Sequence, residues 1–124
     1  MTILAIDTTG EQLHVAVKKD DGAVKALTAP GRPHSKTLLP LIKRLLGKQK
    51  PSAIAVATGP GSYTGTRVGV TTANLLGWTW KIPVYGIPSH EAETVEELLG
   101  QAIERNERNE KSDRALPVYP TIVG

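Results

Sequence analysis

Strand-like hydrophobic patterns occupy the first part of the chain. Residues 2–7 (TILAID) form a short apolar run with β-branched side chains, which is typical of a buried strand. Residues 12–19 alternate with a period of two, as in a half-buried strand. A turn at Asp21 and Gly22 leads into a third strand-like segment, residues 23–29. We therefore expect an antiparallel meander of three strands.

A helical spacing replaces this pattern near Ser35. Ser35 is a suitable N-cap for a helix from about Lys36 to Leu46, and Gly47 is a stop signal. The apolar residues within this segment recur at intervals of three and four, which predicts one buried face. That face comprises Leu38, Leu41, Ile42, Leu45 and Leu46, and Leu39 widens it.

Strands and helices then alternate. Residues 53–58 (AIAVAT) are continuously apolar, like a central parallel strand. A helix that ends near Trp80, a strand over residues 82–87 and a helix that starts near Ser89 complete the pattern. The order βββαβαβα predicts the fold class, which is α/β: a ribonuclease-H-like half domain with a mixed sheet.

The chain changes character after this lobe, to which we assign residues 1–103. Every residue from 104 to 114 is polar, so residues 104–115 are predicted to be a frayed helix end and linker. Residues 116–124 contain two prolines and are expected to form an edge strand or C-terminal tail.

Composition narrows the class of protein. The chain has 124 residues, of which 40% are hydrophobic and 22% charged. This length and composition predict one domain with an aliphatic core. The absence of cysteine excludes disulfides, thiol chemistry and zinc-finger sites. No apolar run approaches the ~20 residues of a membrane span and no signal-peptide pattern is present, so we expect a cytoplasmic protein without membrane contact. The net charge of +3 is mild for a nucleic-acid binder.

The glycine-rich stretch 59–70 (GPGSYTGTRVGV) does not match a nucleotide-binding motif. A phosphate loop needs G-x-x-x-x-G-K-[ST], but Thr64 occupies the fifth position after Gly59 and no lysine is near. The dinucleotide fingerprint fails at the same threonine. We expect instead that Gly59, Pro60 and Gly61 shape a sharp turn from strand to helix, with no cofactor.

Small residues recur every four positions in the helix that follows, at Gly65, Gly69, Ala73 and Gly77. This row allows another backbone to approach closely, which offsets the roughly 1 kcal/mol that each interior glycine costs. The row packs either on this protein's own sheet or on a partner, and the sequence leaves both interpretations open. Trp78, near the end of the helix, is likewise either a core or an interface residue.

A catalytic or metal site is not predicted. A ribonuclease-H nuclease needs several carboxylates around divalent metals, whereas residues 33–50 contain none and the strand 53–58 ends in Thr-Gly-Pro. Asp7 is more simply explained as an acceptor of hydrogen bonds from the turn that follows it. His34 and Ser35 are adjacent and have no acid nearby, so a hydrolase dyad is disfavoured.

Four stretches together resemble the TsaB family, also called YeaZ. They are ILAIDTT (3–9), HSKTLLPLIKRLL (34–46), ATGPGSYTGTRVGVTTA (57–73) and IPVYGIPSHEA (82–92), of which the third is the most specific. The resemblance implies half of an actin/sugar-kinase-like fold. It also implies that the protein takes part in making threonylcarbamoyladenosine in tRNA.

The resemblance further implies a scaffold rather than a catalyst. Family members pair with TsaD, which carries the metal and transfers the threonylcarbamoyl group, while the ATPase TsaE supports turnover and a separate enzyme makes threonylcarbamoyl-AMP. In the family, the two helices that correspond to residues 35–46 and 64–80 pack against their equivalents in TsaD, or form a homodimer instead. Whether tRNA contacts this subunit stays open.

The resemblance places the partner interface on those two helices. The expected interface residues are His34, Ser35, Leu38, Ile42, Gly65, Arg67, Val68, Gly69, Ala73 and Gly77. A bulky change such as Gly69→Leu is then expected to abolish pairing and to leave the monomer folded. Two alternatives are a degenerate ATPase or peptidase of the same fold, and a free homodimer with a regulatory role.

The sequence departs from the family in length. Typical members are roughly twice as long and carry a second, similar lobe, whereas only a polar segment and ALPVYPTIVG follow residue 103 here. The expectation is a shortened member that lacks most of the second lobe and keeps the docking helices.

Overall fold

The structure is a computed structural model, and it describes residues 1–30, 34–61 and 63–108, without the side chains of His34, Ser35 and Tyr63. Its elements follow the predicted order βββαβαβα. They are β1 (Ile3–Asp7), β2 (Gln12–Lys18), β3 (Val24–Pro30), α1 (His34–Leu46), β4 (Ala53–Gly59), α2 (Tyr63–Trp80), β5 (Val84–Pro88) and α3 (Val95–Glu107). The predicted tail and most of the predicted linker lie outside the described residues.

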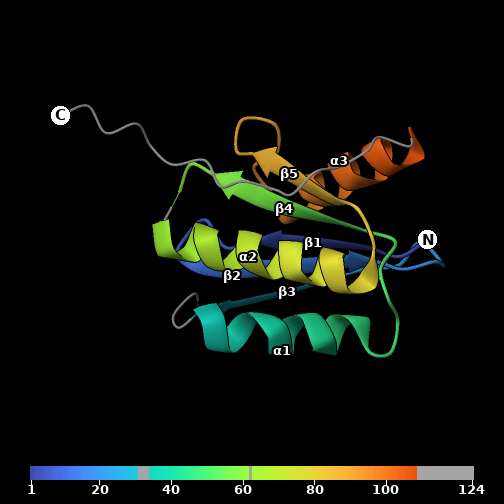
Figure 1. The fold of residues 1–124 in the computed structure, drawn as a ribbon, viewed down its shortest axis with the longest axis horizontal. Helices are drawn as coiled ribbons and strands as arrows, with labels where there is room; N and C mark the ends of the chain where they lie inside the picture. The colour runs from blue at the N-terminus through green and yellow to red at the C-terminus, as the bar shows by residue number, and fades with distance from the viewer. Residues whose placement is uncertain (31–33, 62, 109–124) are drawn as a thin grey trace.

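The five strands form one mixed sheet in the order β3-β2-β1-β4-β5. β1 pairs antiparallel with β2, and β2 antiparallel with β3, which confirms the predicted meander. β4 pairs in parallel with both β1 and β5. Since β3 and β4 consequently point the same way, α1 and α2 both begin at the same edge of the sheet and run side by side (Figure 1).

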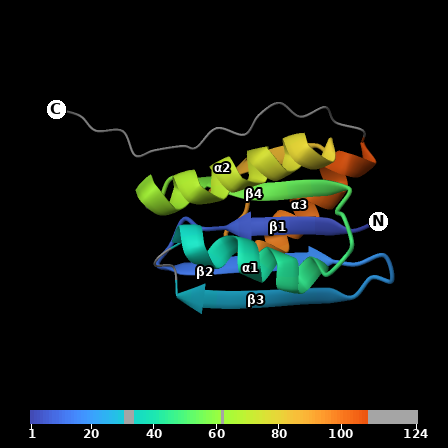
Figure 2. The same ribbon diagram turned by 60° about the horizontal axis from the view of Figure 1, so that its bottom comes forward.

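Two helices cover one face of the sheet, and the third covers the other (Figure 2). Successive strand residues point to opposite faces, so Leu4 and Ile6 join the core under α1 and α2. Ile3 and Ala5 join the core under α3. On β4 the residues that face α3 are all alanine, which lets α3 approach the centre of the sheet.

The observed helix boundaries differ from the predicted ones in three places. α3 begins at Val95 rather than near Ser89, because the hydroxyl of Thr94 accepts a hydrogen bond from the Glu97 backbone N–H at 3.1 Å and caps the helix there. α3 also continues to Glu107, into the segment predicted to fray. α1 already begins at His34, so Ser35 lies inside its first turn. No helix within the described residues is long and apolar enough to cross a membrane.

Candidate partner interface

The glycine-rich turn follows β4 and lies against the turn that follows β1. β4 ends at Gly59, whose φ of +91° lies in the region that favours glycine. Gly61 lies so close to the β1–β2 turn that an added Cβ would approach the carbonyl oxygen of Thr9 to 2.6 Å. Gly59 therefore supplies the positive φ of the predicted turn, and Gly61 allows two backbones to come together.

Asp7, at the end of β1, organises the same turn. Its Oδ1 accepts hydrogen bonds from the backbone N–H of Thr9 at 2.9 Å and from the Thr9 hydroxyl at 2.7 Å. The prediction that this carboxylate serves the turn is confirmed. The described residues contain no group of three or more His, Cys, Asp or Glu side chains placed to hold a metal ion.

The row of small residues on α2 lies against the chain's own sheet. An added Cβ on Gly69 would fall far inside van der Waals contact with the hydroxyl of Thr8, and one on Gly77 would collide in the same way with Val84. Ala73 is 0% exposed between them. Of the two interpretations that the sequence leaves open, the structure shows the packing on the sheet.

This placement revises the predicted interface. Leu38 and Ile42 are 1% and 2% exposed and belong to the core between the helices and the sheet. Gly65, Gly69, Ala73 and Gly77 are also buried. Apolar residues at helical spacing mark the face of a helix that the protein's own sheet covers. Leu38 and Ile42 lie on that face, so they have little surface left for a partner. Among the predicted interface residues with described side chains, Arg67 and Val68 keep substantial exposed surface.

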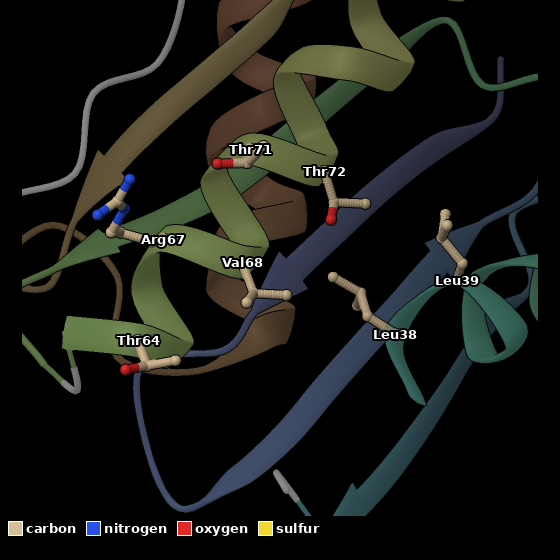
Figure 3. Close-up of a pocket in the computed structure, with 7 residues that line it drawn as sticks. All are labelled: Leu38, Leu39, Thr64, Arg67, Val68, Thr71 and Thr72. Carbon is tan, nitrogen blue, oxygen red and sulfur yellow. The ribbon is translucent and has the colours of Figure 1, made fainter. Parts of the chain in front are cut away.

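With the row of small residues on α2 buried, a groove between α1 and α2 becomes the candidate interface. It is open to solvent, has a volume of about 430 Å³, and is lined by Leu38, Leu39, Thr64, Arg67, Val68, Thr71 and Thr72. In Figure 3 the side chains of Leu38 and Val68 point toward each other across the groove, while Arg67 points away from α1. Its floor is apolar and its α2 wall carries hydroxyl groups.

Exposed hydrophobic side chains continue this surface along both helices. Leu39 on α1 is 44% exposed, and Leu75 and Trp78 on α2 are 57% and 81% exposed. Leu75 follows Thr71 by four residues and Trp78 follows Leu75 by three, so the two apolar side chains extend the wall of the groove. We call the groove together with Leu39, Leu75 and Trp78 the α1–α2 face. The sequence predicts that Leu39 widens the buried face of α1, but the sheet covers only the centre of that face and leaves Leu39 exposed. Sequence reasoning did not single out Leu75; the available signal was an apolar residue outside the row of small residues on α2.

Known proteins are similar to this chain in sequence and fold. A sequence model of the family described as TsaD, tRNA N6-adenosine threonylcarbamoyltransferase, matches residues 16–106. The tRNA threonylcarbamoyladenosine biosynthesis protein TsaB of Bacillus subtilis (strain 168) is 41% identical over 97 residues, which are 73% of this chain and 42% of that protein. The protein of the same name from Escherichia coli (strain K12) is 37% identical over 93 residues, 70% of this chain and 40% of that protein.

The solved structure of YeaZ from Pseudomonas aeruginosa matches with a TM-score of 0.65 at 30% identity. It covers 70% of this chain, which in turn covers 43% of that structure. These likenesses confirm the predicted α/β, ribonuclease-H-like half domain. The chain spans about two fifths of the length of the relatives it matches.

Proposed function

The chain belongs to the TsaB (YeaZ) family, and from this premise we propose that it is a non-catalytic scaffold in the formation of threonylcarbamoyladenosine in tRNA. In this role it binds a TsaD-like transferase and holds that enzyme in its active form. A TsaE-like ATPase joins the larger complex, and a homodimer forms when the partner is absent.

One observation carries the proposal: the α1–α2 face exposes apolar side chains around an open groove. Leu39, Leu75 and Trp78 are 44%, 57% and 81% exposed. A tryptophan with that exposure contributes little to this protein's own core, whereas tryptophan is enriched at the centres of protein interfaces. The groove between two parallel helices also has the shape that receives a ridge from a partner helix.

The carboxyl ends of β1 and β4 also support the proposal, because an enzyme of this fold would need reactive groups there. At the carboxyl ends of β1 and β4, the carboxylate of Asp7 and the hydroxyls of Thr8 and Thr9 are engaged in holding the turn and α2. A scaffold role needs no reactive group there.

Co-expression of this chain with the TsaD-like protein from the same genome tests the proposal. We expect a stoichiometric complex by native mass spectrometry. Leu75→Gln should weaken it, because the change replaces an exposed apolar side chain of the α1–α2 face with a neutral polar one. Val24→Gln is the matched control, since Val24 is 51% exposed on β3 and does not line the groove.

One outcome would count against the scaffold role, and another against the α1–α2 face as its contact surface. A stable homodimer that ignores the partner would favour the free regulatory homodimer. A complex that Val24→Gln weakens as much as Leu75→Gln would move the contact away from the α1–α2 face. If the complex forms as expected, reconstitution of threonylcarbamoyladenosine formation with and without this chain measures the activation.

A further inference from the structure

Charge is strongly segregated along this chain. Between Gly22 and His90 the sequence contains no aspartate or glutamate, whereas nine lysines and arginines fall within that stretch. The stretch includes α1 and α2 entirely, so neither helix holds a carboxylate. The mild net charge of +3 therefore hides a basic middle part of the chain between two acidic parts. A local concentration of one sign of charge attracts the opposite sign even when the net charge is small.

Four of these cations gather at one end of the fold. Arg44 lies in the last turn of α1, Lys48 and Lys50 follow that helix, and Lys25 is the second residue of β3. Because α1 packs on β3 and runs back along it, the end of α1 and the start of β3 lie at the same end of the sheet (Figure 2). Lys25 points to the side covered by α1, as does Leu27 two residues later. All four cationic side chains are exposed, and we call them the basic patch.

The basic patch lies apart from the α1–α2 groove. At about 100° per residue, Arg44 lies roughly 140° around the axis of α1 from Leu39, which lines the groove. Lys25, Lys48 and Lys50 do not line the groove either. A protein that occupies the groove therefore need not cover the basic patch.

The charge of the basic patch is not neutralised by the part of the chain that the structure describes. No ion pair among those residues involves a side chain of the patch. The carboxylates closest to Lys25 in the sequence, Asp20 and Asp21, have other partners. A hydrogen bond from the α-amino group of Met1 lowers the pKa of Asp20 and keeps it paired. Asp21 accepts a hydrogen bond of 2.9 Å from the backbone N–H of Ala23 within its own turn.

Stabilisation of α1 does not account for the basic patch. A cation in the last turn of a helix interacts favourably with the helix dipole, which explains Arg44. This effect is confined to the last turn, whereas Lys25 belongs to a strand and Lys50 lies beyond the end of α1. Cations that gather without partners repel one another. Their common location is therefore better explained by an anion that binds from outside.

We propose that the basic patch contacts the phosphate backbone of tRNA, the substrate of the modification in which this family takes part. The inference rests on the proposed function, which names tRNA, and it adds a binding role for this subunit. Lysine and arginine contacts to phosphates fix the position and orientation of a nucleic acid without reading its sequence. The subunit thus holds the tRNA while the transferase modifies it.

The chemistry of the basic patch favours a nucleic acid over an acidic protein. The core of a protein interface is apolar and rich in aromatic side chains. Gly47 and Gln49, which lie between the cations in the sequence, are exposed and carry no such side chain. Val24, the exposed apolar residue beside Lys25, points to the opposite face of the sheet. Phosphates need only positive charge and hydrogen-bond donors.

The affinity for tRNA of the complex between this chain and the TsaD-like protein tests the inference. Unmodified tRNA transcript is titrated at several salt concentrations between about 0.05 M and about 0.3 M. Lys48→Glu should raise the Kd about fivefold or more and should reduce the slope of log affinity against log salt by about one, because a phosphate contact is lost. Lys25→Glu, on a different element, should act in the same direction.

Arg108→Glu is the matched control. It changes the net charge as much as Lys48→Glu does, but at the end of α3, which covers the other side of the sheet. It should leave the Kd for tRNA within about twofold, since phosphate contacts act locally. Lys48→Gln removes the charge without reversing it and should give a smaller shift in the direction of Lys48→Glu. Binding of the TsaD-like protein should be the same for all four variants, and urea unfolding checks that each one is folded.

The outcomes separate this inference from the proposed function. No complex with the TsaD-like protein would overturn the proposed function and, with it, the substrate named here. A complex that modifies tRNA, but whose affinity for tRNA responds equally to Lys48→Glu and Arg108→Glu, would overturn the inference alone. So would loss of the protein complex on Lys48→Glu, which would assign the basic patch to the transferase. Binding to phosphatidylserine vesicles that Lys48→Glu abolishes, with tRNA affinity unchanged, would assign it to a membrane instead.

Discussion

The hydroxyl of Thr8, at the end of β1, donates a hydrogen bond of 2.5 Å to the carbonyl oxygen of Gly65 in the first turn of α2. The two residues are 57 positions apart in the sequence, and both are buried. Thr8 also occupies the space that Gly69 leaves between α2 and the sheet. The bond therefore ties the first turn of α2 to the residue that follows β1.

We predict that Thr8→Val destabilises the protein by about 0.5–1.5 kcal/mol, because it removes the buried hydrogen bond from the Thr8 hydroxyl to the Gly65 carbonyl. Valine keeps the shape of threonine, so little of the loss comes from packing. The free energy of unfolding from urea titration measures the effect. Thr8→Ser keeps the hydroxyl and should recover most of the hydrogen-bond contribution, and equal losses for the two variants would contradict the role of the bond.

We predict that Gly69→Ala lowers stability by roughly 1–3 kcal/mol despite the better helix propensity of alanine, because the new methyl group would collide with Thr8. Gly69→Leu should prevent folding rather than only block pairing, which corrects the expectation from the sequence. The matched control is Gly100→Ala within α3, where nothing lies within 4 Å of an added Cβ.

Gly100→Ala should therefore raise stability by about 0.5–1 kcal/mol through propensity alone. Thermal and urea unfolding of both variants checks the pair. If Gly69→Ala were also stabilising, α2 would have to lie farther from the sheet than the structure places it.

We predict opposite consequences for the two tryptophans of α2. Trp78 is 81% exposed, so Trp78→Ala should change the free energy of unfolding by less than about 0.5 kcal/mol. Trp80 packs partly against the core, so Trp80→Ala should cost more, about 1–3 kcal/mol. Binding to the TsaD-like protein should show the reverse order, with a loss of about 2 kcal/mol or more for Trp78→Ala, as for a tryptophan anchor.

Calorimetric titration of the complex, with urea unfolding of each free variant, measures both quantities. Unchanged affinity for Trp78→Ala would exclude this side chain from the contact. Such a result would confine the interface to the groove itself.

We predict that ATP with magnesium does not stabilise this chain. The alternative of a degenerate ATPase requires a bound nucleotide, which at 100 times its Kd would add about 2.7 kcal/mol and raise the melting temperature. Thermal unfolding with and without the nucleotide measures this directly. A clear upward shift would revive the enzyme interpretation, and a point change at the Gly59–Gly61 turn would then locate the site.

Much of the fold follows from local patterns in the sequence. The period-two alternation over β2, the continuous apolar run of β4 and the helical spacing of α1 each predict an element that the structure contains. Such patterns are local because each reflects which side of a single element is buried. The start of α3 was predicted too early, because the cap is the Thr94 hydroxyl and Ser89 instead bonds through its backbone N–H to the Gly59 carbonyl.

The sequence by itself determined the strands and helices, the turn role of Asp7 and the absence of carboxylates from α1 and α2. Only the tertiary structure decided which surface of α2 is free. Glycines at a spacing of four are equally compatible with a sheet beneath them or a partner above them, and the difference depends on whether Thr8 and Val84 occupy that space. Contacts between residues so distant in the chain exist only once the sheet is assembled, and that assembly leaves Leu39, Leu75 and Trp78 exposed.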